Sequence, residues 1–237
     1  EVRKEFEQEK QELTVKLEEQ VHELMGDRPI NLNSPEQLSW IIYSRKVNDK
    51  PTWAEAYDDR VSNTQHTDNI RRLTTKLYKQ KAERCNECYG SGQIRKTRKD
   101  GTPHKNTNKC PTCSSTGFLY TNKKDFAGLK FIAPDYKWAS ANGFSTSKGN
   151  LIYLEGIARS RGMHDAEVFL QRVRRLSALD TYLSSFVEGI ATHVKPDGKL
   201  HVRLLQHRTG TGRLSGADPN MQNMPRGGTF PVKKVFI

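Results

Sequence analysis

The sequence predicts an α+β fold: a mainly helical region interrupted by a cysteine-rich ribbon, followed by antiparallel strands. Apolar residues recur at helical spacing over residues 1–25 and 165–190. Two Cys-x-x-Cys pairs lie between these stretches. From residue 191 the period changes, and Pro-Asp-Gly at 196–198 predicts a turn between two short apolar runs, 191–194 and 200–205. We expect a further strand over 230–237.

The first helix is expected over residues 1–25, because apolar residues recur at helical spacing: Phe6, Leu13, Leu17, Val21 and Leu24. Gly26 suits its C-terminal end. A second helix should begin after Ser34, with Pro35 at its first position and Gln37 completing a capping box. Residues 70–84 are predicted to form a basic helix that leads into the cysteines.

Two more helices are expected after a turn at residues 143–149, one over 150–159 and one that begins near Asp165. The second has a long apolar stripe: Phe169, Val173, Leu176, Leu179, Leu183, Phe186 and Ile190. Arg172, Arg174 and Arg175 fall mostly off this stripe, so we expect them to be exposed.

Positive charge is unevenly distributed along the 237 residues, whose net charge is +12. Residues 1–84 carry 15 basic and 16 acidic residues, residues 85–120 carry 6 and 2, and residues 121–237 carry 18 and 9. A basic surface of this kind favours nucleic acid or an anionic membrane as a partner. No apolar run is long enough to span a membrane, and residues 1–12 lack the apolar segment of a signal peptide. We therefore expect a cytoplasmic or nuclear protein.

The four cysteines are Cys85, Cys88, Cys110 and Cys113, with 21 residues between the two pairs. Four thiolates in this spacing can surround one Zn²⁺ tetrahedrally, with no open position for catalysis. Two disulfides are an alternative that the absence of a secretion signal disfavours. A redox dithiol is a second alternative. The pattern resembles one zinc module of the DnaJ-type cysteine-rich domain. His104, in the intervening loop, is interpreted as a bystander.

The loop between the cysteine pairs is basic, and its cations could contact DNA phosphate or form a solvated hairpin tip. These residues are Arg95, Lys96, Arg98, Lys99, Lys105 and Lys109.

Residues 209–226 read Thr-Gly-Thr-Gly-Arg-Leu-Ser-Gly-Ala-Asp-Pro-Asn-Met-Gln-Asn-Met-Pro-Arg. This segment resembles the signature of family A DNA polymerases, Thr-Gly-Arg-Leu-Ser followed by Pro-Asn-x-Gln-Asn-x-Pro. Residues 31–38, 144–147 and 180–182 resemble phrases of the thumb in the same family, and 232–237 resembles the strand before the first catalytic aspartate. Gly216 stands where the family usually has a second serine, and Met221 where leucine is common.

The resemblance implies that this chain contacts primer–template DNA. Minor-groove acceptors lie at nearly equivalent places in all four base pairs, so Arg213 could donate to the primer-terminal pair whatever its sequence. Gln222 and Asn223 would make contacts of the same kind, and Asn220 would hold the loop or a template sugar. Thr211 belongs to the same set. On the predicted helix, Arg174, Arg175 and Ser177 would contact backbone phosphates.

The resemblance also implies which parts of the enzyme lie outside the chain. It stops before the palm aspartates that hold Mg²⁺ for phosphoryl transfer, and the fingers that bind dNTPs are absent. We therefore expect a fragment, or one half of a split enzyme completed by a second chain. The zinc insert suggests a phage or other viral branch, and hence the host cytoplasm.

This interpretation divides the chain into first thumb helices (1–84), a zinc-binding insert (85–120), remaining thumb helices (121–190) and the start of the palm (191–237). A non-catalytic zinc-ribbon protein that binds nucleic acid is the alternative, but it does not explain residues 209–226. A DnaJ-like co-chaperone would need four knuckles and a His-Pro-Asp motif, and the chain has neither.

Overall fold

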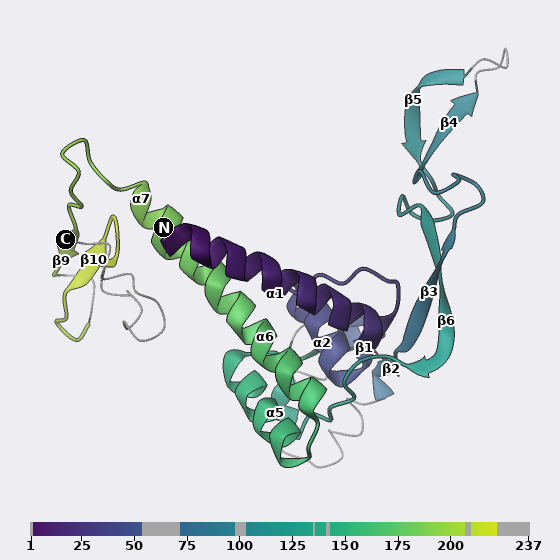
Figure 1. The fold of residues 1–237 in the computed structure, drawn as a ribbon, viewed down its shortest axis with the longest axis horizontal. Helices are drawn as coiled ribbons and strands as arrows, with labels where there is room; N and C mark the ends of the chain where they lie inside the picture. Colours follow the sequence, from purple (N-terminus) through teal and green to yellow (C-terminus); the bar gives the residue numbers. More distant parts are fainter. Residues whose placement is uncertain are drawn as a thin grey trace. The chain divides into compact units, whose positions relative to one another are not determined.

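A computed structural model describes residues 2–53, 72–97, 103–134, 136–140, 143–206 and 210–221. It contains helices and antiparallel strands, which confirms the α+β prediction (Figure 1). The chain forms two compact units, Leu17–Leu170 and the combination of Glu1–Lys16 with Gln171–Ile237. The proposed division into thumb, insert and palm stays a prediction. Within the described residues, no helix is long and apolar enough to cross a membrane.

The two predicted N-terminal helices are confirmed as α1 (Val2–Met25) and α2 (Pro35–Tyr43). Gly26 follows α1 with a φ of +82°, a conformation that glycine adopts without steric cost. The Ser34 hydroxyl caps α2 by accepting from the Gln37 amide. The capping box is only half correct, because the Gln37 side chain accepts from the Asn31 amide at 2.7 Å instead of from Ser34.

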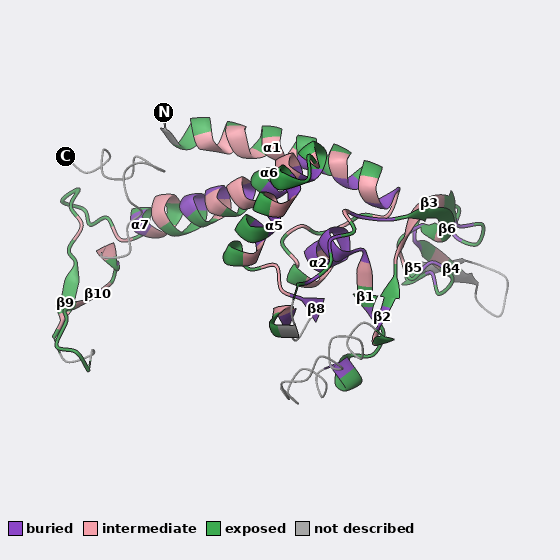
Figure 2. Cartoon of the chain, turned by 90° about the horizontal axis from the view of Figure 1, so that it is seen from below, coloured by how far each residue is buried: buried purple, intermediate pink, exposed green. Residues whose placement is uncertain are grey.

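The later helices are α5 (Lys148–Ser160) and α6 (His164–Thr181), which continues into the π-helix η2 (Tyr182–Glu188) and the short α7 (Gly189–Ala191). Ser147 caps α5. Asp165 lies in the first turn of α6 and not at its cap, because the helix begins one residue earlier. The predicted apolar stripe is buried from Phe169 to Ile190, with Phe186 half-buried. Figure 2 shows buried positions recurring along this helix.

Each unit has its own core. In the unit that contains both chain ends, Leu179, Tyr182 and Leu183 are buried against Phe6 and Leu13 of α1. The rings of Phe6 and Tyr182 meet edge to face, with centroids 5.0 Å apart.

In the other unit, the core is built around α2, where Ile41 and Ile42 are fully buried. Phe144 of β8 (Gly143–Phe144) packs on Tyr43 and Trp53, and β8 pairs with β7 (Ala139–Ser140) after the short 3₁₀ helix η1 (Tyr136–Trp138).

The predicted basic helix over residues 70–84 is wrong. The structure has two strands, β2 (Thr74–Lys76) and β3 (Tyr78–Arg84). β2 pairs with β1 (Arg45–Val47), and β3 pairs antiparallel with β6 (Phe118–Phe126). The many basic residues of this segment are typical of the solvent-exposed face of a helix, which is why a helix was predicted. Pairing with β6, far along the sequence, decides the conformation instead, since strand preference depends strongly on cross-strand neighbours.

The predicted hairpin after residue 191 is only partly correct. Residues 189–191 are still helical, and a single antiparallel bridge joins Val194 to Leu200 around the Pro-Asp-Gly turn. The strand at the end of this stretch, β9 (Arg203–Leu205), pairs instead with β10 (Ser215–Ala217). The expected strand over 230–237 lies outside the described residues.

A cysteine-rich arm begins with β3 and ends with β6. We call these residues, 78–126, the zinc arm. Its chain ends are tied to the helices. Asp27, just past α1, accepts from the Ala82 amide, and Gln80 accepts from the Asp27 amide. Where the chain leaves the arm, the amides of Leu129 and Phe131 donate to the last carbonyls of α2. These bonds satisfy the orphan groups of a helix end, so α2 fixes the base of the arm.

Candidate metal centre and nucleic-acid interface

Two knuckles connect the ladder of β3 and β6 to a second ladder, formed by β4 (Gln93–Thr97) and β5 (Pro103–Lys109). The knuckles repeat with an offset of 25 residues. The Cys85 amide donates to the Gly117 carbonyl at 3.0 Å, and the Cys110 amide donates to the Gly92 carbonyl at 2.9 Å. Each knuckle therefore closes on the other, and the sequence repeat produces a near-twofold structure.

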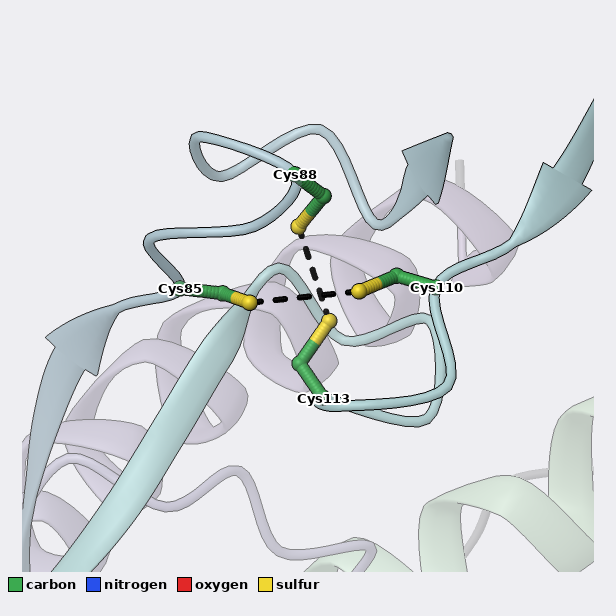
Figure 3. A group of neighbouring side chains, drawn as sticks. All are labelled: Cys85, Cys88, Cys110 and Cys113. Carbon is green, nitrogen blue, oxygen red and sulfur yellow. Dashed lines mark hydrogen bonds between the residues drawn. The ribbon is translucent and has the colours of Figure 1, made fainter. Parts of the chain in front are cut away.

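The four cysteine side chains point toward one another (Figure 3). The Sγ atoms of Cys85 and Cys110 are 3.9 Å apart, and those of Cys88 and Cys113 are 3.6 Å apart. Thiolates around a zinc ion at about 2.3 Å lie about 3.8 Å from one another in a tetrahedron. All four ligand atoms lie within 4.8 Å of one another and all four residues are buried. The set therefore fits one Zn²⁺, as predicted from the spacing.

Backbone amides donate hydrogen bonds to two of the sulfurs, which stabilises the thiolate form that binds a metal. The Gly92 amide donates to Cys88 Sγ at 3.3 Å, and the Gly117 amide donates to Cys113 Sγ at 3.2 Å. Burial acts to raise the pKa of the Cys88 thiol, but the Gly92 amide and the neighbouring thiols act against it and lower that pKa to about 7. Burial raises the pKa of Cys110 to about 12. Zinc would displace the thiol protons, and its bonds to four sulfurs would hold the two knuckles together.

Two glycines allow the knuckles to touch. A Cβ on Gly92 would lie 2.3 Å from the Ser115 carbonyl oxygen, and one on Gly117 would lie 2.4 Å from that of Gly90. Both residues have positive φ, +70° and +79°. A side chain at either position would meet backbone and would also require a strained conformation.

The polymerase-like segment, residues 209–226, contains β10 and much of the connection that joins it to β9. Thr211 and Arg213 lie in this connection, and Asn220 lies three residues past β10; all three are exposed. Their exposure is compatible with the predicted DNA contacts, which stay a prediction. Gln222 and Asn223 lie outside the described residues.

The basic residues of α6 are less exposed than predicted. Arg172, Arg174 and Arg175 are half-buried, whereas Ser177 is exposed. Arg175 donates two hydrogen bonds to the Glu9 carboxylate of α1, at 2.6 and 2.8 Å. The sequence did not indicate this partner, since 166 residues separate the two. Arg175 is therefore held on α1, and phosphate contacts by the α6 residues stay a prediction.

Comparison with known proteins gives partial matches. A stretch of 84 residues, 35% of this chain, is 38% identical to DNA polymerase I of Bacillus subtilis. A stretch of 82 residues, 34% of the chain, is 39% identical to thermostable DNA polymerase I of Thermus filiformis. A shorter stretch of 42 residues, 18% of the chain, is 50% identical to DNA polymerase I of Lactococcus lactis. Part of the chain is similar to DNA polymerase I.

That similarity covers a small share of each relative. The aligned stretches span 8%, 9% and 5% of the three polymerases, so the chain matches less than a tenth of their length. No family model matches the chain.

Sequence reasoning missed one prominent side chain of the zinc arm. Tyr89 follows Cys88 in the first knuckle with a φ of +50° and is 74% exposed. Its carbonyl accepts from Arg84 Nε at 2.7 Å, which ties the knuckle to the end of β3. The Cys-x-x-Cys-x-Gly pattern indicates a turn at this position but not the exposure of the ring.

Proposed function

We propose that this chain is the thumb and the opening of the palm of a family A DNA polymerase, and that it grips primer–template DNA during 5′–3′ synthesis. The observation that carries the proposal is the segment 209–226, whose polar residues have the order of the family signature. The partial similarity to DNA polymerase I supports the same assignment.

In this function Arg213 tests the geometry of the primer-terminal base pair. A guanidinium in the minor groove can donate to purine N3 or pyrimidine O2, which a mismatch displaces. Gln222, Asn223, Asn220 and Thr211 would act beside it, and Arg174, Arg175 and Ser177 would add contacts with phosphates. The exposure of Thr211, Arg213 and Asn220 in the hairpin region supports this role.

The chemistry itself requires groups beyond this chain. The catalytic carboxylates that hold Mg²⁺, and the fingers that bind dNTPs, would belong to a palm–fingers portion on the same or a second chain. Zn²⁺ would hold the inserted arm without entering the reaction. The insert is the reason to propose a phage or viral enzyme, which would act in the host cytoplasm.

The test is primer extension by the assembled polymerase, with this chain joined to or mixed with its palm–fingers portion, in Mg²⁺ and dNTPs. Arg213→Ala should cut extension by about tenfold or more, the effect expected for about 1.4 kcal/mol of lost binding, and it should lower discrimination against a mismatched primer end. Arg203→Ala is the matched control, because it removes the same charge from β9 of the same hairpin. It should leave mismatch discrimination unchanged.

A second candidate, a non-catalytic zinc-ribbon protein that binds nucleic acid, has its own support in the cysteine cluster and the basic charge. The same assay separates the two functions. An assembly that binds primer–template but never extends it, with no effect of Arg213→Ala, refutes the polymerase assignment and favours this candidate.

A further inference from the structure

The zinc arm concentrates the positive charge of the chain. Residues 78–126 contain eleven Lys and Arg against four Asp and Glu, a net charge of +7 out of +12. A Zn²⁺ ion with four thiolates would contribute −2 at the buried centre, which still leaves the arm at +5. About a fifth of the sequence therefore carries more than half of its formal net positive charge.

Some cations elsewhere in the molecule form ion pairs within the fold, and others, such as Lys4 and Lys195, are exposed without one among the described residues. Arg159 pairs with Glu167 at 2.8 Å, and Lys10 pairs with Asp180 at 2.7 Å. Four cations of the arm make no ion pair with any residue that the structure describes: Lys79, Arg95, Lys109 and Lys124. Lys79 is half-buried and the other three are exposed. Their charge is therefore available to an external anion.

The arm contributes surface and almost no core. Its buried cluster consists of the four cysteines with partly buried Ile94. Phe118 and Phe126 of β6 remain 42% and 43% exposed. A ribbon without an apolar core requires a metal for stability. The metal would thus hold together two ladders, β3–β6 and β4–β5, most of whose side chains, where the structure describes them, are not buried.

The ladders present their cations in rows. Arg95 lies opposite Thr107, and Lys109 lies opposite Gln93, so both cations share one face of the β4–β5 ladder. On the other ladder, Lys79 and Lys81 are two residues apart along β3, next to a register irregularity between Tyr78 and Gln80. The strands β3 and β5 each have seven residues, about 20 Å in length. Duplex DNA carries one negative charge per about 1.7 Å of its axis, so a ladder of this length can meet several phosphates.

We propose that the zinc arm is a second DNA-binding surface, which contacts the phosphate backbone of the duplex irrespective of sequence and separately from residues 209–226. The choice of DNA as the polyanion rests on the proposed function, while the charge and its exposure do not. Such contacts add affinity and orientation but carry no sequence information.

The experiment measures binding of a fluorescent blunt duplex of about 30 base pairs by anisotropy, from about 50 to 200 mM KCl. The zinc-loaded chain is compared with a variant in which Lys79, Arg95, Lys109 and Lys124 are changed to Gln. Each lost phosphate contact should reduce the slope of log K against log salt by about 0.9. Four lost contacts would reduce it by about 3.6, so the wild-type affinity would fall about 150-fold more than the variant's over this salt range.

A matched control changes four exposed lysines outside the arm to Gln: Lys4, Lys16, Lys195 and Lys199. The proposal stands if the arm variant loses at least about two units of slope and the control keeps the wild-type slope. It is overturned if the arm variant keeps its slope, or if both variants lose it equally, since the effect would then depend on net charge alone. Tighter binding of an RNA duplex through the same four residues would overturn the assignment to DNA.

Zinc content measured on each variant shows that the arm is folded. A blunt duplex tests the arm independently of polymerase activity and of Arg213. If the assembly binds primer–template but never extends it, while the arm variant loses salt dependence, the proposed function fails and the arm proposal survives.

Discussion

Replacing Gly117 with alanine should weaken zinc binding through two separate costs. The left-handed backbone, with a φ of +79°, costs an alanine about 1–2 kcal/mol. Because the metal site forms as zinc binds, this cost weakens zinc affinity about 5- to 30-fold. The new Cβ would also lie 2.4 Å from the Gly90 carbonyl oxygen, whereas such atoms normally stay at least about 3.3 Å apart. The knuckles must then separate, so the total loss should exceed the backbone effect alone.

Competition with a chromophoric chelator measures this loss directly. Gly162→Ala is the matched control, because Gly162 also has a positive φ, +67°, but a Cβ there would meet nothing within 4 Å. It should leave zinc affinity unchanged and lower only the free energy of unfolding of the helices, by about 1–2 kcal/mol. Zinc affinity of Gly117→Ala within about threefold of wild type would refute the close packing of the two knuckles.

Three other predictions rest on local contacts. Chelation of zinc should expose the arm to proteolysis between residues 78 and 126 without shifting tryptophan emission, because the three tryptophans, Trp40, Trp53 and Trp138, lie outside the arm; a large emission shift would contradict this. The hydrogen bond from Arg175 lowers the pKa of Glu9, so the pair stabilises the fold above the unfolded pKa of about 4.3 and the stabilisation is lost as pH falls through the lower folded pKa. Since both side chains are about a third exposed, Glu9→Gln should cost only about 0.5 kcal/mol in urea unfolding at pH 7, and this cost should shrink as pH falls through the lowered folded pKa; a cost that does not change with pH would contradict the ion pair. Ser34→Ala should lower stability by about 1 kcal/mol through loss of the α2 cap, and Ser177→Ala, on an exposed face of α6, should change it by less than about 0.5 kcal/mol; similar losses in both would contradict the cap.

The sequence predicts those features of this protein that local chemistry decides. The α1 stripe with its Gly26 end, the Ser34 cap and the four-sulfur cluster depend on residues a few positions apart, or on a spacing with one common use. Features that need a distant partner were missed. Residues 78–84 are a strand because β6, about 40 positions later, pairs with them. The ion pair between Arg175 and Glu9 was not predicted, because Glu9, on another helix, cannot be inferred from the sequence around residue 175.

Hydrogen bonds at the base of the arm join it to the helices. Its two ends return to one place, because Gln80 and Ala82 bond to Asp27 at the end of α1, while the Gly128 amide bonds to α1 and the Leu129 and Phe131 amides bond to α2. The Gly128 amide donates to the Leu24 carbonyl, and a Cβ on Gly128 would lie 2.3 Å from the Ile41 carbonyl oxygen. The carbonyls at the ends of two helices, which need partners in any fold, thus become the attachment of the arm.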